Sequence, residues 1–270
     1  MMARAQRHLI LAALVSTIGA VSARAATCQN PAGFGAFLQQ VRQDAAGAGV
    51  SPRAIDESLT GVTIDNDVLH ADHAQGVFHQ SFEQFSGRMI SGLRLSKGRQ
   101  MLKRYAPVFA KIQRQYGVPG PMIVALWGLE TSYGAFMGKY PTIRSIATLA
   151  FDCRRSPFFQ KELIDAMRIV QHGYLRPSQM HGAWAGELGQ TQFMPSSYLK
   201  FAVNYGGGGN LITSVPDVLA STANYLHSYG WQSGQPWDPG TANFAVIQQW
   251  NKADVYSRTI ALFADKLAGK

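Results

Sequence analysis

The chain has 270 residues, of which 46% are hydrophobic and only 15% are charged. This composition excludes an intrinsically disordered protein, which would be poor in apolar residues and rich in charge. The 25 Lys and Arg against 16 Asp and Glu give a net charge of +9, so an acidic partner is expected: nucleic acid, anionic lipid or an acidic polymer.

The first 25 residues have the three-part layout of a secretory signal peptide. Arg4 and Arg7 precede an apolar run at Leu9–Val21, and Ala23-Arg24-Ala25 has small residues where a signal peptidase cleaves. The apolar run is too short for a permanent transmembrane helix. We expect cleavage near Ala25 and a periplasmic protein with no permanent membrane anchor; the alternative is a buried N-terminal helix.

Export changes the expected partner and permits a disulfide. Removing residues 1–25 takes away three Arg and no acidic residue, which leaves a net charge of +6. An exported protein without a basic run is not expected to bind nucleic acid, whereas an anionic polymer outside the cytoplasm fits. The two Cys, Cys28 and Cys153, can form one bridge in an oxidising compartment, or they can be two buried thiols.

Residues 26–270 contain no repeat, low-complexity tract or linker, so a single domain is expected. Apolar residues at helical spacing, N-cap residues, prolines and glycines predict a mainly α (α+β) fold with a small irregular or β portion. Loops are expected at Gly206–Gly209 and Gly230–Gly240. The predicted helices are Phe34–Ala48, one that starts at Ser51-Pro52, Leu93–Tyr116 with Gly117 as its C-cap, Pro121–Thr131, Thr142–Ala150, Pro157–Gln171, Ser214–Tyr229 and Ala253–Leu267.

The helix Pro121–Thr131 reads PMIVALWGLET and carries a carboxylate at its end. Eight consecutive non-polar residues, Met122–Leu129, predict a helix that is buried on all sides. Apolar surroundings disfavour the charged form of Glu130 and should raise its pKa. A carboxyl with a raised pKa is a competent general acid near neutral pH. The alternative is that Glu130 points to solvent beyond the helix.

A second segment, Gly182–Tyr198, reads GAWAGELGQTQFMPSSY. Its glycines allow backbone to come close to a ligand. Gln192 and Phe193 offer an amide and an aromatic ring, which are the groups that bind sugar hydroxyls, acetamido groups and ring faces.

Together the two segments resemble a known family. GLETSYG at Gly128–Gly134 with GELGQTQFMPSSY at Gly186–Tyr198 is similar to the lytic murein transglycosylases of the membrane-bound lytic transglycosylase B type, family 3. The resemblance extends over nearly all of residues 26–270. It includes FDCRRSPFF at Phe151–Phe159, STANYL at Ser221–Leu226 followed by Gly230-Trp231, and NFAVIQQWNKADVY at Asn243–Tyr256.

This resemblance implies a lysozyme-like catalytic fold with extra flanking helices. It implies cleavage of the β-1,4 bond between N-acetylmuramic acid and N-acetylglucosamine in peptidoglycan, without water, so that the muramyl 6-hydroxyl closes a 1,6-anhydro ring. Glu130 matches the single acid/base. The implied partner is the peptidoglycan glycan strand, and we expect a monomer that needs no cofactor.

The resemblance also assigns residues to the substrate groove. Arg154 and Arg155 would hold the lactyl or stem-peptide carboxylates, and Asn251 would orient the acetamido group. From the residues alone, the Arg pair could equally be solvated, and each aromatic residue could belong to the core. The residues expected to bind substrate are Tyr133, Arg154, Arg155, Gln192, Phe193, Tyr225, Trp250, Asn251 and Tyr256.

Departures from the family pattern keep two alternatives open. Glu187 is an acid where the family commonly has an apolar or small residue, which allows a hydrolytic muramidase with Glu130 and either Glu187 or Asp152. A non-catalytic peptidoglycan-binding protein is the other alternative. Ala183 replaces a groove Ser of many members. No separate C-terminal wall-binding domain is expected.

No metal site is expected. Many members of the family carry an Asp-rich calcium loop, but the corresponding residues Asn204–Ile212 include no carboxylate, which calcium usually requires. His70 and His73 with Asp67 and Asp72 lack the spacing of a zinc site, so we interpret them as a solvated helix start.

Two further patterns are set aside. Ser197–Lys200 fits S-x-x-K, but no Lys is followed by Thr-Gly or Ser-Gly, as penicillin-binding proteins require. Gly206–Gly209 lacks the Lys-Ser/Thr of a phosphate loop.

Overall fold

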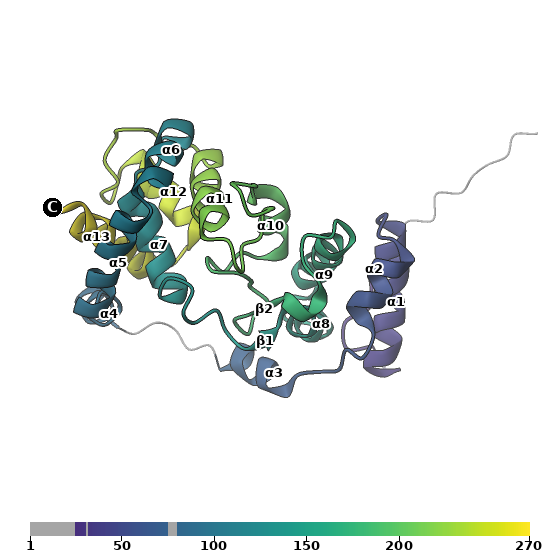
Figure 1. Cartoon of the computed structure of the whole chain (residues 1–270). Helices are drawn as coiled ribbons and strands as arrows, with labels where there is room; N and C mark the ends of the chain where they lie inside the picture. The colour runs from purple at the N-terminus through teal and green to yellow at the C-terminus, as the bar shows by residue number, and fades with distance from the viewer. Residues whose placement is uncertain (1–24, 31, 75–79) are drawn as a thin grey trace, which may run out of the picture.

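The computed structural model describes residues 25–30, 32–74 and 80–270, so the expected signal peptide lies outside the described residues except for Ala25. The described chain is mainly helical (Figure 1). Its elements are α1 (Gly33–Gly47), α2 (Pro52–Leu59), α3 (Asn66–His73), α4 (Phe82–Met89), α5 (Gly92–Arg104), α6 (Ala106–Tyr116), α7 (Gly120–Thr131), β1 (Tyr140–Pro141), α8 (Thr142–Phe151), α9 (Ser156–Gln171), a 3₁₀ turn at Pro177–Gln179, β2 (His181–Gly182), α10 (Pro195–Phe201), α11 (Val215–Ser228), α12 (Ala242–Trp250) and α13 (Asp254–Ala268).

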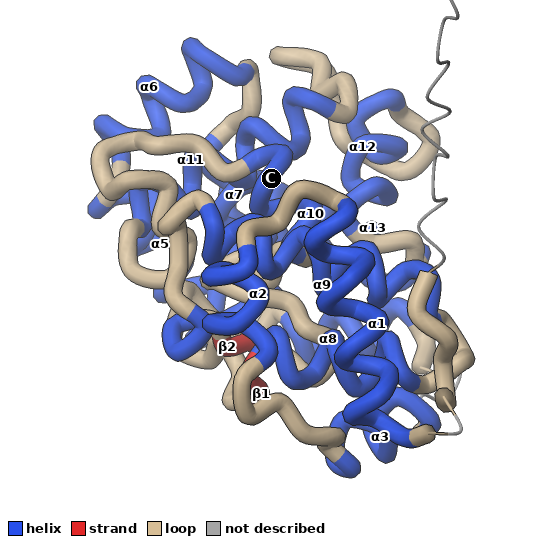
Figure 2. The backbone as a smooth tube through the Cα atoms, turned by 90° about the vertical axis from the view of Figure 1, so that its right-hand side faces the viewer, coloured by secondary structure: helices blue, strands red, loops and turns tan. Residues whose placement is uncertain are grey.

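The helices form two groups joined through α10. In one group α7 packs against α5, α6, α11 and α13. In the other, α9 packs against α1, α2 and α8, and Figure 2 shows α1 and α9 side by side. Helix α10 contacts α9 on one side and α11 on the other. A single cluster of buried apolar side chains runs through both groups.

The β structure is minimal. Strands β1 and β2 pair antiparallel, with Tyr140 opposite Gly182 and Pro141 opposite His181. A separate bridge joins Leu188 to Phe193. The prediction of a mainly α fold with a small β portion is therefore confirmed.

Helix α7 is the central element that the sequence predicted. Every residue from Met122 to Leu129 is buried, which confirms the expectation from the uninterrupted apolar run. A helix surrounded in this way has no solvent-facing side, so polar groups are confined to its last turn.

The single helix predicted over Leu93–Tyr116 is wrong. The chain breaks at Tyr105 into α5 and α6, and Pro107 lies in the first turn of α6. Proline has no N–H for the helical ladder and is tolerated only in a first turn, which explains the break. Gly117 ends α6 with a φ of 73°, so its predicted role as C-cap is confirmed.

The short helices α4 and α12 were not predicted, and α3 was expected only as a solvated helix start, which is wrong for the buried Asp72. Their N-caps, Asp65, Ser81 and Thr241, each accept a backbone N–H from the first turn. These capping residues were the available sequence signal, but helices of eight or nine residues give little periodicity to support it.

Cys28 and Cys153 form a disulfide with a Cα–Cα distance of 5.2 Å, which resolves the alternative that the sequence left open. The bridge fixes the segment before α1 to the turn between α8 and α9. Among the residues described, no helix has both the length and the apolar character needed to cross a membrane.

Replacing both cysteines, Cys28→Ser with Cys153→Ser, should lower the free energy of unfolding by about 2–4 kcal/mol, because the bridge closes a long loop in the unfolded chain. The loop spans a sequence separation of 125. Urea unfolding measures the change. A reductant should bring the unmodified protein to the same stability as the double variant, and equal stability before reduction would contradict the prediction.

Candidate active site

Glu130 lies in the last turn of α7 and is held by two donors from the C-terminal helices. Its Oε1 accepts hydrogen bonds from Trp250 Nε1 at 2.8 Å and from Tyr256 Oη at 2.9 Å. Trp250 is the last residue of α12, and Tyr256 lies in the first turn of α13. Residues separated by 120 and 126 positions thus fix one carboxyl oxygen.

A cavity of about 440 Å³ opens beside this carboxyl group. It joins the end of α7 to the glycine-rich segment that precedes α10 and to the junction of α12 and α13. The two sequence motifs, far apart in the chain, therefore form one site. The cavity is lined by Met89, Leu129, Glu130, Ala183, Glu187, Gln192, Met194, Trp250, Asn251 and Tyr256.

Burial raises the pKa of Glu130 to about 7, although the hydrogen bonds from Trp250 and Tyr256 act in the opposite direction. The charge of Glu187 raises it further. At neutral pH the group therefore exchanges between its acid and its carboxylate form, which a residue that both donates and accepts a proton requires. Burial also raises the pKa of Tyr256, so its hydroxyl remains a donor.

The backbone after Glu130 turns sharply. Ser132, Tyr133 and Gly134 have φ values of 51°, 64° and 78°, so three consecutive residues are left-handed. Positive φ is costly for residues with a Cβ and persists only where surrounding contacts enforce it. Gly134 N donates to Thr131 Oγ1 at 2.9 Å, which closes the turn.

Gln190 ties this turn to the second motif. Its backbone oxygen accepts from Thr131 Oγ1 at 2.6 Å, and its Oε1 accepts from Trp127 Nε1 at 2.9 Å. A Cβ on Gly134 would lie only 2.4 Å from Gln190 Oε1. The close approach of the two segments thus depends on a glycine at this position.

Tyr133 is buried and does not line the cavity. Its hydroxyl donates to Arg94 O at 2.7 Å, and its ring fits between two glycines. A Cβ on Gly98 or Gly128 would lie 2.6 or 2.7 Å from that hydroxyl oxygen. The side chain therefore locks α5 against α7.

Gln192 lines the cavity and also shapes it. Its Nε2 donates to Gly189 O at 2.8 Å and to Met137 O at 3.1 Å, while its Oε1 accepts from Ala183 N at 3.2 Å. The close backbone packing expected of the glycine-rich segment is present, since a Cβ on Gly182 would lie 1.6 Å from a backbone oxygen.

Phe193 and Tyr225 are buried behind the cavity wall. Their ring centroids lie 5.5 and 4.9 Å from that of Trp250. Tyr225 Oη also donates to Gln249 O at 2.6 Å. These contacts orient Trp250, which in turn donates to Glu130.

The two candidates for a second carboxylate lie in different places. Glu187 lines the same cavity as Glu130, burial raises its pKa, and its Oε2 is buried with no hydrogen-bond partner in the described part of the chain. Asp152 is not among the cavity residues; its Oδ2 lies 2.9 Å from His73 Nε2. Only Glu187 shares the site with Glu130.

Arg154 and Arg155 lie outside the cavity lining and both bind the buried Asp72. Arg154 Nε donates to Asp72 Oδ2 at 2.7 Å. Their side chains remain 44% and 41% exposed, so each guanidinium retains a solvent-facing part. The charge of Arg155 acts against the burial that raises the pKa of Glu187.

Among the described residues, one cluster has side chains of the kind that bind metal ions. Oxygen and nitrogen atoms of Asp72, His73 and Asp152 lie within 4.8 Å of one another. Both oxygens of Asp72 already accept from Arg154 and Arg155, and two guanidinium groups disfavour a cation there. His70 and Asp67 are not part of this cluster.

The loop at Asn204–Ile212 is organised around a carboxylate that the sequence interpretation overlooked. Asp217, fully buried in α11, accepts four backbone N–H groups at 2.6–3.1 Å. The loop thus directs donors to a central anion, an arrangement opposite to that of a cation site. The absence of a calcium site stays a prediction. The four donors are the amides of Tyr205, Gly207, Gly209 and Asn210.

Comparison with known proteins identifies relatives of this chain. Residues 33–241 match the family described as Transglycosylase SLT domain. The chain is 33% identical over 153 residues to membrane-bound lytic murein transglycosylase B of Escherichia coli (strain K12), an alignment that covers 56% of this chain and 42% of that protein. The chain thus matches less than half the length of this curated relative.

Solved structures agree with this relationship. SltB3 from Pseudomonas aeruginosa, in complex with NAG-anhNAM-pentapeptide, is 30% identical and superimposes with a TM-score of 0.82 over 87% of this chain and 80% of that chain. The soluble lytic transglycosylase SltB1 from Pseudomonas aeruginosa, at 23% identity, has a TM-score of 0.80 over 86% of this chain and 98% of its own. The second likeness shows the fold alone.

The turn after Glu130 gives a test with a matched control. Gly134→Ala places a Cβ at a positive φ and against Gln190, whereas Gly173→Ala has a positive φ but no atom within 4 Å. Gly134→Ala should lower the free energy of unfolding by about 1–3 kcal/mol more than Gly173→Ala, since overpacking adds to the backbone cost. Urea unfolding compares the two, and equal losses would show that the close approach to Gln190 does not constrain the turn.

Proposed function

The chain belongs to the Transglycosylase SLT domain family, and on this premise we propose that it acts as a lytic transglycosylase on peptidoglycan. The reaction cleaves the β-1,4 bond between N-acetylmuramic acid and N-acetylglucosamine and leaves a 1,6-anhydro-N-acetylmuramic acid end. The observation that carries the proposal is the half-buried Glu130, with a pKa of about 7, at the wall of a cavity with amide and aromatic side chains. SltB3 in complex with NAG-anhNAM-pentapeptide supports this substrate class.

Glu130 would perform both proton transfers. In its acid form it donates a proton to the glycosidic oxygen, and that bond to the muramyl C1 breaks. The resulting carboxylate then removes the proton from the muramyl 6-hydroxyl, whose oxygen bonds to C1. No water enters, and Glu130 returns to its acid form.

The surroundings of Glu130 suit this cycle. Burial favours the acid form before the first step. After proton transfer, the N–H of Trp250 and the O–H of Tyr256 stabilise the carboxylate through the hydrogen bonds that they already make. The substrate supplies the nucleophile, so the second carboxylate of ordinary glycosidases is not required.

Substrate contacts are assigned by position. Gln192, Trp250, Asn251 and Tyr256 line the cavity, and we propose that they contact the glycan, with Asn251 at the acetamido group. Tyr133, Phe193 and Tyr225, which were expected to bind substrate, would act indirectly, since all are buried and support the turn after Glu130 or the ring of Trp250.

Arg154 and Arg155 would bind the carboxylates of the lactyl group or stem peptide through their exposed parts, while Asp72 holds them in place. We further propose that the protein is exported to the periplasm, where its substrate lies. There it would act as a monomer without a cofactor, with residues 26–270 as one catalytic domain.

A hydrolytic muramidase is the second candidate, because Glu187 lines the same cavity as Glu130. A water-activating base must be ionised, however, and burial raises the pKa of Glu187, so a smaller share of it is ionised at a given pH than of an exposed glutamate. This favours the one-carboxylate reaction. Asp152 would not serve as the base, since it faces His73 instead of the cavity.

Digestion of purified sacculi followed by mass analysis of the released muropeptides separates the alternatives. The proposal predicts anhydro ends, lighter by one water than reducing ends, and no release by Glu130→Gln, which still sediments with sacculi. Reducing ends would support the muramidase and contradict the proposal. Binding without release by the unmodified protein would identify a non-catalytic binder.

The pH dependence of release tests the role of Glu187. The first step needs the acid form of Glu130, so activity falls as pH rises through its pKa of about 7. Glu187 raises that pKa, and Glu187→Gln should therefore move the alkaline limb to lower pH while anhydro ends persist.

Glu57, an exposed residue that forms an ion pair with Arg53, provides the control. Glu57→Gln should leave the pH dependence of release unchanged. If the alkaline limb of Glu187→Gln lies at the same pH as in the unmodified protein, or if this variant releases no muropeptides, the role of Glu187 is not purely electrostatic.

A further inference from the structure

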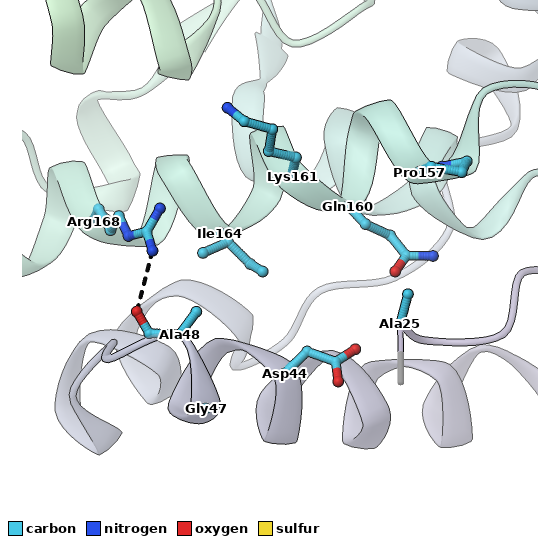
Figure 3. Close-up of a pocket in the computed structure, with 9 residues that line it drawn as sticks. All are labelled: Ala25, Asp44, Gly47, Ala48, Pro157, Gln160, Lys161, Ile164 and Arg168. Carbon is cyan, nitrogen blue, oxygen red and sulfur yellow. Dashed lines mark hydrogen bonds between the residues drawn. The ribbon is translucent and has the colours of Figure 1, made fainter. Parts of the chain in front are cut away.

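A second cavity, of about 430 Å³, lies between α1 and α9, and none of its lining residues belongs to the Glu130 site (Figure 3). Pro157 and Ile164 give it apolar wall, and Asp44 extends from α1 into the space between the helices. Figure 3 shows the carboxylate of Asp44 directed toward Ala25 and Gln160. Ala25 is the residue after which the signal peptide is predicted to be cleaved.

The residues that follow the predicted cleavage site are firmly fixed. Ala26 is buried, and its carbonyl oxygen accepts from Gln160 Nε2 at 2.6 Å. Thr27 N donates to Gln40 Oε1 at 2.8 Å, and Cys28 is held by its disulfide. The nitrogen of Ala26 therefore has one defined position at the edge of this cavity.

Asp44 lines the same cavity as Ala25, the residue next to that nitrogen, and its carboxylate is directed toward Ala25 (Figure 3). The backbone N–H of Ala26 lowers the pKa of Asp44, while burial, the larger effect, raises it. The other charged groups that line the cavity, Lys161 and Arg168 from α9, both pair with Asp165 at 2.8 Å. The Asp44 carboxylate is thus partly buried beside a neutral backbone amide. A cation at the position of that amide would stabilise its negative charge.

We propose that this cavity is the binding site for the α-ammonium group of the processed chain. Cleavage after Ala25 consumes one water: the Ala25–Ala26 peptide bond breaks, Ala25 leaves as a carboxylate, and the nitrogen of Ala26 becomes an ammonium group. The neutral donor opposite Asp44 is thereby replaced by a cation. Ala25 forms part of the cavity wall, so its departure leaves room for water around the new ammonium group.

Processing would therefore complete the fold. The new ion pair joins the N-terminus to α1, the hydrogen bond from Gln160 joins it to α9, and the disulfide joins it to the turn between α8 and α9. This inference rests on the predicted cleavage after Ala25 and not on the proposed enzymatic activity, so the two fail independently.

The test begins with the intact mass of protein exported to the periplasm, which should identify Ala26 as the first residue. Unfolding is then followed against pH for the mature protein, for Asp44→Asn and for the control Asp238→Asn on the exposed surface. The unfolded α-amino group has a pKa of about 8, and pairing raises it in the folded state. The stabilisation is therefore complete below about pH 8 and is lost as pH rises through the folded value.

At pH 7 Asp44→Asn should raise the unfolding equilibrium constant by about five- to tenfold, and by less than about twofold at pH 10. Asp238→Asn should change neither. If the unfolding equilibrium constants of the mature protein and Asp44→Asn still differ to the same extent at pH 10, Asp44 has a merely structural role and the proposal is overturned. A first residue other than Ala26 would also overturn it.

A second measurement reports on the amine itself. Acylation of the Ala26 nitrogen at pH 8, followed by mass spectrometry of the N-terminal peptide, requires the unprotonated amine. The ion pair predicts acylation about tenfold slower in the mature protein than in Asp44→Asn, because pairing holds the proton. Equal rates would contradict the ion pair even if the variant is destabilised.

Discussion

The proposed chemistry depends on one constraint: a carboxyl group is carried into apolar surroundings at the end of a helix that is buried on all sides. Helix α7 has no exposed face along Met122–Leu129, and Glu130 follows this run directly, in the last turn, where a cavity reaches the helix. Burial there disfavours the charge, and two donors from α12 and α13 keep the carboxylate form accessible. These opposing effects leave the pKa near neutrality.

Much of the remaining structure holds this arrangement in place. Gln190 connects the turn after Glu130 to the glycine-rich segment, while Phe193 and Tyr225 hold the ring of Trp250. Tyr133 locks α5 to α7. Phe193, Tyr225 and Tyr133 thus act through other side chains, whereas the aromatic residues Trp250 and Tyr256 line the cavity together with amides, carboxyls and methionines.

The sequence predicts most of the fold because its strongest signals are local. An unbroken apolar run predicts α7, prolines mark the starts of α2, α7, α9 and α11, and Gly117 marks the end of α6. The break between α5 and α6 shows the limit of periodicity, since an apolar pattern continues across Pro107 although the hydrogen-bond ladder does not. The sequence could not decide whether Cys28 and Cys153 form a disulfide, because their proximity is a property of the tertiary fold.

Site residues were predictable where they lie in recognisable motifs, but their orientation was not. Tyr133 and Trp250 come from equally suggestive segments, yet one ring is buried under α5 and the other faces the cavity. Gln190 and Asp217 were missed because their contacts, with Thr131 and Trp127 for Gln190 and with loop backbone N–H groups for Asp217, form only in the folded chain. Met89 lines the site from α4, a helix for which the sequence offered little periodicity.

The central claim is that the apolar surroundings of Glu130 keep its carboxyl group partly protonated at neutral pH. A ¹³C NMR titration of side-chain carboxyl groups, with Glu130→Gln to assign the resonance, measures this directly. The account predicts an inflection at about pH 7 that disappears in the variant. An inflection at the ordinary glutamate value of about 4.3 would contradict it, because the group would then be a carboxylate when the glycosidic oxygen needs a proton.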